Sequence, residues 1–269
     1  MSIRTLMALL LALAASVAAP AAAETLPPVE TLKARIGAAP SVVRVYEPHL
    51  STAAAPVAVA YVGYPAELVL AALFGAEWRS KAATIEFHAL DGYVSRVPAA
   101  RFAPGKAFIV FARADGRPFT VDNVAQNERD VPLGPYYLVW ENVADAAARA
   151  EGARHWPYQV TEIVPSTASD SVLTPPGLDP RLRGGAALAA THCLSCHQVN
   201  GYGGRKFPAN LAEIARAMEE PDFTAWLLAP SSRRKDTTMP ALAPRLPEAE
   251  RRRVARALFE YLRGVPVVE

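Results

Sequence analysis

The sequence predicts a two-domain protein, with an N-terminal α+β domain that contains a mixed sheet and a C-terminal all-α domain. Residues 166–179 are rich in proline, serine and threonine and have no apolar period, which is typical of a linker. Residues 24–165 contain short alternating or apolar runs that indicate strands. In residues 180–269, apolar side chains recur at helical spacing instead.

Within the N-terminal domain, strand patterns are more frequent than helical ones. Four segments have the alternation or the short apolar runs of strands: residues 84–90, 107–112, 136–140 and 160–164. Residues 66–74 predict a helix that ends at Gly75. The Asp-Gly pairs at 91–92 and 115–116 predict turns.

The C-terminal domain has four helical segments: residues 180–192, 211–218, 222–228 and 247–262. The last of them is the clearest, because Val254, Leu258 and Leu262 repeat on one face. Pro247 suits the first position of a helix, and the glutamates that follow it complement the positive end of the helix dipole.

Residues 1–23 predict a secretory signal peptide. Arg4 precedes an apolar run at residues 6–17, and Ala21-Ala22-Ala23 offers a cleavage site. A retained membrane anchor is the alternative, but the run is short for a span of about 20 apolar residues. We therefore expect a periplasmic protein without a membrane span after cleavage.

Residues Cys193-Leu194-Ser195-Cys196-His197 form the attachment pattern for a c-type haem. Each thiol can add to one vinyl group of the porphyrin, and His197 can then bind the iron from the same side. A redox dithiol would gain nothing from the adjacent histidine, and a zinc site would need two more ligands. The motif uses both cysteines of the chain, so it predicts one covalent haem.

The sixth iron ligand is predicted to be Met239. Pro240 makes its loop rigid, whereas Met218 lies in a helical run where core packing is the simpler role. A histidine or an open site remains as the alternative. Ligation by His197 and Met239 would fill both axial positions, which favours electron transfer over catalysis at the iron.

The C-terminal region resembles class I cytochromes c. The resemblance includes Gly185, the haem motif, the run from Pro208 to Leu211, Thr238-Met239-Pro240 and the final Tyr261-Leu262. It implies a cytochrome c fold in which the Pro208 carbonyl accepts a hydrogen bond from the proximal imidazole. It also implies that Tyr261 packs near Gly185. An ordinary loop residue is the alternative for Pro208. Trp226 is expected either to bond a haem propionate or to pack in the core.

Residues 60–165 resemble the sulfite-oxidase-type molybdopterin domain. The similar features are Asp91-Gly92-Tyr93 after a strand, Gly134-Pro135 before a later strand, and a loop with Trp156. Active members of that family bind molybdenum through a cysteine thiolate, but both cysteines here lie in the haem motif. We therefore do not expect molybdopterin. If anything binds, His88, Arg96 and Arg113 are candidate pocket residues, although each also fits an ordinary surface position.

The charge is unevenly distributed. Residues 24–177 contain 13 Lys and Arg against 16 Asp and Glu, and residues 178–269 contain 14 against 10. This balance does not suggest nucleic acid, but a basic haem domain favours docking of acidic redox partners. The leading prediction is an exported monohaem cytochrome c that carries single electrons and is not an enzyme.

Two other functions remain open. One is a molybdopterin-type oxidoreductase, or its electron-accepting subunit, that passes electrons to the fused haem; a periplasmic oxidoreductase would then be a partner. The other is a haem-based sensor with a labile sixth ligand.

Overall fold

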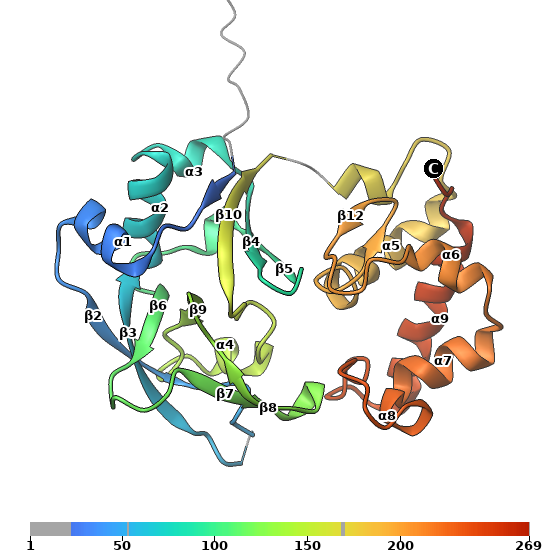
Figure 1. Ribbon diagram of the computed structural model, residues 1–269. Helices are drawn as coiled ribbons and strands as arrows, with labels where there is room; N and C mark the ends of the chain where they lie inside the picture. The colour runs from blue at the N-terminus through green and yellow to red at the C-terminus, as the bar shows by residue number, and fades with distance from the viewer. Residues whose placement is uncertain (1–22, 53, 168–169, 269) are drawn as a thin grey trace, which may run out of the picture.

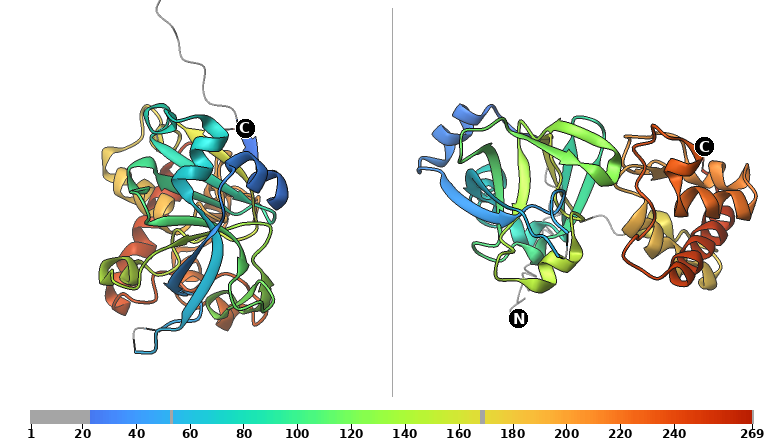
Figure 2. Two further views of the ribbon diagram at one scale, coloured as in Figure 1. Left: turned by 90° about the vertical axis from the view of Figure 1, so that its left-hand side faces the viewer. Right: turned by 90° about the horizontal axis from the view of Figure 1, so that it is seen from below.

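The computed structural model of the chain describes residues 23–52, 54–167 and 170–268. Two domains lie side by side, the first built mainly from strands and the second from helices (Figures 1 and 2). The predicted two-domain fold class is confirmed. The predicted signal peptide lies outside the described residues except for Ala23. In the described part of the chain, no helix is both long and apolar enough to cross a membrane.

The N-terminal domain contains two four-stranded sheets and a small hairpin. The strand orders are β1-β10-β4-β5 and β2-β3-β6-β9, and β7 pairs with β8. The strands are β1 (Glu24–Thr25), β2 (Ser41–Tyr46), β3 (Ala58–Pro65), β4 (Thr84–Ala89), β5 (Val94–Pro98), β6 (Ala107–Arg113), β7 (Thr120–Asn123), β8 (Glu128–Pro132), β9 (Tyr137–Trp140) and β10 (Val160–Ser166). Within the described part of this domain all the named strand pairs are antiparallel, so its sheets are antiparallel rather than mixed.

Three helices lie together at one end of these sheets, and a fourth lies apart from them (Figure 1). They are α1 (Val29–Ile36), α2 (Ala66–Phe74), α3 (Trp78–Lys81) and α4 (Ala146–Glu151). Helix α2 has the predicted bounds, and it buries Val69, Leu70 and Leu73. One hydrophobic core contains side chains from both four-stranded sheets and from α2. Strands β4, β6, β9 and β10 lie where the sequence predicts them, whereas β2 and β3 were not predicted.

The C-terminal domain contains five α-helices and a short hairpin in its described residues. They are α5 (Arg183–His192), α6 (Leu211–Arg216), α7 (Glu220–Leu228), α8 (Pro230–Arg233), α9 (Glu248–Gly264), β11 (Gln198–Val199) and β12 (Tyr202–Gly203). Helix α9 packs against α5, α6 and α7 and contributes Leu258, Tyr261 and Leu262 to a second core. The predicted helical segments therefore form a compact bundle around the C-terminal helix.

Part of the segment predicted as a linker packs on the C-terminal domain. Leu173 and Leu178 are buried in the core of that domain. The Tyr261 hydroxyl donates a hydrogen bond to the Leu173 carbonyl at 3.0 Å. Strand β10 also extends to Ser166. The composition of residues 166–179 resembles a linker, but their buried leucines fix part of the segment to the bundle.

The crossing of α5 and α9 depends on Gly185. A Cβ atom at this position would lie 2.4 Å from the Tyr261 Cβ and 2.5 Å from the Ala257 carbonyl oxygen. This contact agrees with the packing that the resemblance implies for Tyr261.

Replacing Gly185 with alanine should therefore lower the free energy of unfolding of the C-terminal domain by about 1–3 kcal/mol, because the added methyl group forces the helices apart. Urea unfolding followed by circular dichroism measures this loss. Gly184→Ala is the matched control, since nothing lies within 4 Å of its added Cβ. An equal loss in both variants would contradict the packing argument.

Candidate haem-binding site

A cavity of about 1230 Å³ lies between the two domains. From the C-terminal domain it is lined by Cys193, Cys196, His197 and Met239, the four residues predicted to hold the haem. Leu211, Leu227 and other apolar side chains complete this part of its wall. The structure thus places the predicted haem ligands around one mostly apolar space.

The haem motif forms a turn directly after α5. The backbone N–H of Cys196 donates to the Cys193 carbonyl at 3.2 Å, and that of His197 donates to the same carbonyl at 3.0 Å. This turn brings both thiols and the imidazole to the same wall of the cavity.

The two thiols do not have the properties of a redox dithiol. Burial raises the pKa of Cys193 to about 12 and that of Cys196 to about 11. Reactive dithiols instead have lowered pKa values, because their function requires a thiolate. The site therefore disfavours the alternative of thioredoxin-type chemistry.

His197 is suited to binding a metal as a neutral imidazole. Burial lowers its pKa, and its ring stacks on Phe207 with 5.3 Å between the ring centroids. Its Nδ1 atom is buried and has no hydrogen-bond partner among the described residues.

The hydrogen bond predicted between His197 and the Pro208 carbonyl is not present in the structure. That carbonyl accepts from Gln198 Nε2 at 2.9 Å instead. In the structure, the Pro208 oxygen is therefore bonded to the side chain of Gln198 and not to the imidazole.

Met239 lies in a loop between α8 and α9. Its backbone N–H donates to Thr237 Oγ1 at 3.2 Å, and Trp226 Nε1 donates to its Sδ atom at 3.1 Å. Trp226 is half-buried and lines the cavity. Its indole N–H is directed at the thioether of Met239, and its ring is not fully buried in the core. Met218 also lines the cavity and packs on the core.

These residues fit a covalently bound haem. Two thiols are three residues apart on one turn, and a neutral imidazole with an unpartnered nitrogen follows them. A thioether held by an indole N–H lines the same apolar cavity. Imidazole and thioether are a common axial ligand pair for haem iron.

The turn between β4 and β5 lies directly against the haem-attachment loop. The Val94 N–H donates to the Ser195 carbonyl at 2.8 Å, and the Arg205 N–H donates to the Gly92 carbonyl at 2.7 Å. Gly92 has a φ of 85°, and a Cβ there would lie 2.8 Å from the Arg205 carbonyl carbon. The predicted Asp-Gly turn thus permits close contact between the two backbones.

Charged side chains support this contact. Lys206 Nζ lies 2.9 Å from Asp91 and 3.8 Å from Glu128, both on the N-terminal domain. Arg96 donates to the Leu194 carbonyl at 3.2 Å and lies 4.5 Å from the centre of the Tyr202 ring. Part of the charge asymmetry in the sequence therefore serves contact between the chain's own two domains.

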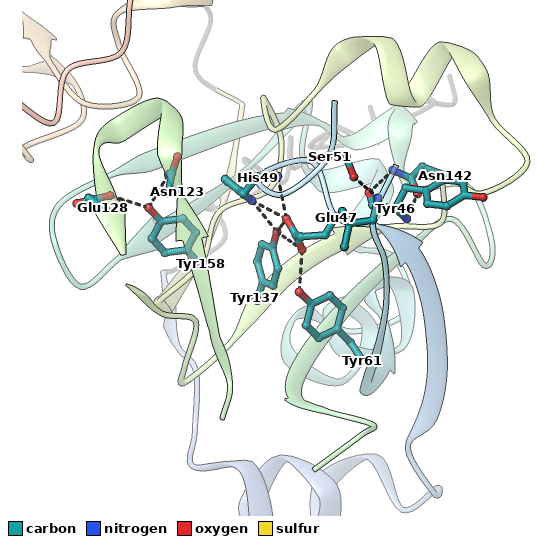
Figure 3. Close-up of polar contacts among 11 residues, drawn as sticks. Tyr46, Glu47, His49, Ser51, Tyr61, Asn123, Glu128, Tyr137, Asn142 and Tyr158 are labelled. Atoms are coloured by element: carbon teal, nitrogen blue, oxygen red, sulfur yellow. Dashed lines mark hydrogen bonds and ion pairs between the residues drawn. The ribbon is translucent and has the colours of Figure 1, made fainter. Parts of the chain in front are cut away.

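His49 lines the cavity on the side of the N-terminal domain, and behind it lies a buried polar cluster that sequence reasoning missed (Figure 3). Glu47 is fully buried and accepts hydrogen bonds from Tyr61 at 2.8 Å and from Tyr137 at 3.0 Å. His49 Nδ1 lies 2.6 Å from the same carboxylate. The signal was Glu47 itself, a carboxylate in register with the inward-facing Val43 and Val45.

Burial raises the pKa of Glu47. The hydrogen bond from His49, the positive charge that His49 carries when it is protonated, and the hydrogen bond from Tyr61 outweigh burial, so that the net pKa lies below 4.5. Burial also raises the pKa of Tyr137 well above its usual value. Glu47 is therefore an ionised carboxylate that is held by neutral hydroxyl donors.

The other candidate residues of the N-terminal domain lie outside the cavity. His88 contacts Glu86 at 3.1 Å and Glu162 at 3.4 Å, and Arg113 pairs with Asp115 at 2.7 Å. Of the three, Arg96 alone contacts the C-terminal domain in the described structure. Within the described ranges, no group of three or more His, Cys, Asp or Glu side chains is arranged to hold a metal ion.

Residues 182–265 match the family model for cytochrome c. The C-terminal domain is therefore a cytochrome c domain, a type of domain that binds haem c covalently and transfers electrons. No family model supports the resemblance of the N-terminal domain to molybdopterin proteins. A comparison with curated proteins finds no match to this chain.

Proposed function

We propose that the protein is an exported, periplasmic monohaem cytochrome c that carries single electrons between redox partners. In this proposal Cys193 and Cys196 hold the haem as thioethers, and His197 and Met239 bind the iron. The observation that carries the proposal is the convergence of these four side chains on one cavity.

The chain's own residues define what the haem can do. The neutral imidazole of His197 and the soft sulfur of Met239 would fill both axial positions, and the sulfur favours the ferrous state. Trp226 holds the thioether in place through its 3.1 Å hydrogen bond. The haem would supply reversible one-electron chemistry when bound, and with both residues on the iron it would offer no open position to a substrate.

In this proposal the N-terminal domain is a docking module that positions the haem domain on a redox partner. It covers the loop that carries the haem motif, so a redox partner would reach the basic C-terminal domain over its remaining surface. A periplasmic oxidoreductase is the kind of partner that this arrangement suits. A molybdenum enzyme of the sulfite-oxidase type would need a cysteine thiolate as ligand, and both cysteines of the chain are assigned to the haem.

Elemental analysis tests the proposal most directly. The protein would be purified from the periplasm of a host that matures both haem c and molybdopterin. We expect about one iron per chain in covalent haem, no molybdenum, and a one-electron redox titration. Stoichiometric molybdenum would overturn the proposal in favour of a self-contained oxidoreductase, and an absence of covalent haem would overturn it altogether.

Replacing Met239 with alanine should lower the reduction potential by on the order of 0.1 V, out of the roughly 0.8 V range that axial ligands span. The oxidised protein should also lose its sulfur-to-iron absorption band, because the thioether no longer binds the iron. Spectroscopic redox titration measures both effects. Met218→Ala is the matched control, since Met218 lines the same cavity. Equal effects in the two variants, or none in either, would exclude Met239 as the ligand.

A further inference from the structure

The Glu47 cluster has chemical features that haem binding does not use. Its four side chains, Glu47, His49, Tyr61 and Tyr137, come from the N-terminal domain, and none of them belongs to the proposed haem ligands. Burying an ionised carboxylate is costly, and well-packed apolar residues are often at least as stable. A purely structural explanation of the cluster is therefore incomplete.

The cluster fixes the orientation of His49. Nδ1 lies 2.6 Å from Glu47 Oε1 and 3.3 Å from the Tyr137 hydroxyl. A carboxylate in this position holds the proton of a neutral imidazole on Nδ1 and leaves Nε2 as a hydrogen-bond acceptor. The same relation between carboxylate and histidine orients catalytic and ligand-binding imidazoles in other proteins.

The side chain of His49 forms part of the wall of the cavity. The side chain is only 6% exposed, and it lines the space that separates the two domains. Among the described residues, none forms a hydrogen bond with Nε2. Nδ1 is turned toward Glu47, so Nε2 is the atom left to meet a ligand.

The surroundings of His49 favour a flat, apolar ligand. The Tyr158 ring lies edge-on to the imidazole, with 5.7 Å between centroids, and Trp156 and Leu50 line the same wall. Aromatic rings pack well in such edge-to-face arrangements. Small-molecule sites commonly combine an apolar lining with a few fixed polar groups.

From this arrangement we propose that the N-terminal wall of the cavity binds a small aromatic alcohol of the phenol class. The ligand hydroxyl donates a hydrogen bond to His49 Nε2, and the ligand ring packs among Tyr158, Trp156 and Leu50. Glu47 and Tyr137 are positioning residues that hold the imidazole. This binding site lies beside the haem ligands but does not depend on electron transfer through them.

Isothermal titration calorimetry of the haem-containing protein with phenol and with anisole tests the proposal. Anisole has the same ring but lacks the hydroxyl donor. We expect phenol to bind about tenfold more tightly than anisole, which corresponds to about 1.4 kcal/mol for one hydrogen bond. Equal affinities, or no binding of phenol at millimolar concentration, would overturn the proposal.

Variants of two histidines make the test specific. In His49→Phe the tenfold preference for phenol should disappear. His88→Phe should retain it, because His88 also pairs with a carboxylate but lies outside the cavity. If His49→Phe fails to fold, the ¹⁵N shift of His49 Nε2 in the wild-type protein gives the answer. Phenol, but not anisole, should move that signal, and an unchanged signal would contradict the site.

Discussion

A variant with alanine at both Cys193 and Cys196 should carry no covalently attached haem. The thioethers need both thiols, and the chain has no other cysteine to replace them. Without the haem, the apolar side chains that line the cavity would face water, so the helical domain should also lose stability. Haem staining after denaturing electrophoresis measures attachment, and circular dichroism measures the remaining helix.

Single variants and one control make this result specific. Cys193→Ala and Cys196→Ala should each retain one thioether, with a weaker haem stain. Ser195→Ala should stain like the wild type, because it changes the motif but leaves both thiols. Covalent haem in the double variant would show that the attachment site lies elsewhere.

The elements that the sequence predicted well are those with strong local patterns. Helix α2 has a clear stop at Gly75, and α9 follows Pro247 with a regular apolar face. The haem motif was recognisable because its chemistry requires adjacent residues. In each case a short window of sequence contained the information.

The contact between the domains and the Glu47 cluster depended on distant residues. Glu47, Tyr61 and Tyr137 come from separate parts of the chain. They meet because β2, β3 and β9 belong to the same four-stranded sheet, and Glu47 directly follows β2. The turn at Gly92 was predicted, but its role in meeting Arg205 needed the structure. Local periodicity carries no information about such pairs.

The contact between the domains uses part of the uneven charge of the chain. The sequence suggested that the basic haem domain would attract acidic partners. In the structure, Asp91 and Glu128 of the chain itself lie near Lys206, beside the haem-attachment loop. Lys206 of the haem domain is therefore paired with acidic residues of the N-terminal domain in the same chain.

Replacing Glu47 with alanine should lower the free energy of unfolding of the N-terminal domain by about 3–5 kcal/mol. The carboxylate is fully buried, and its removal leaves the Tyr61 and Tyr137 hydroxyls without their acceptor. Urea unfolding followed by tryptophan fluorescence measures this loss, because Trp78, Trp140 and Trp156 all lie in the N-terminal core.

Glu86→Ala is a matched control for this variant. Glu86 also contacts a histidine two residues further along, but its side chain is 13% exposed. Water can replace part of its interactions, so we expect a cost of about 1 kcal/mol or less. Equal losses in the free energy of unfolding for the two variants would mean that the burial of Glu47 does not determine how much it stabilises the domain.

The pH dependence of Glu47→Gln tests whether the carboxylate is ionised. The pKa of Glu47 in the folded protein lies below its usual value of 4.5, so its ionised form contributes stability above that pH. This contribution is lost as the pH falls through the folded-state pKa. The stability difference between the wild type and Glu47→Gln should therefore be largest above pH 4.5 and narrow steadily in more acidic solution. A difference that stays constant or widens in acid would mean that Glu47 is protonated in the folded protein, and that His49 is oriented by a neutral acid instead of a carboxylate.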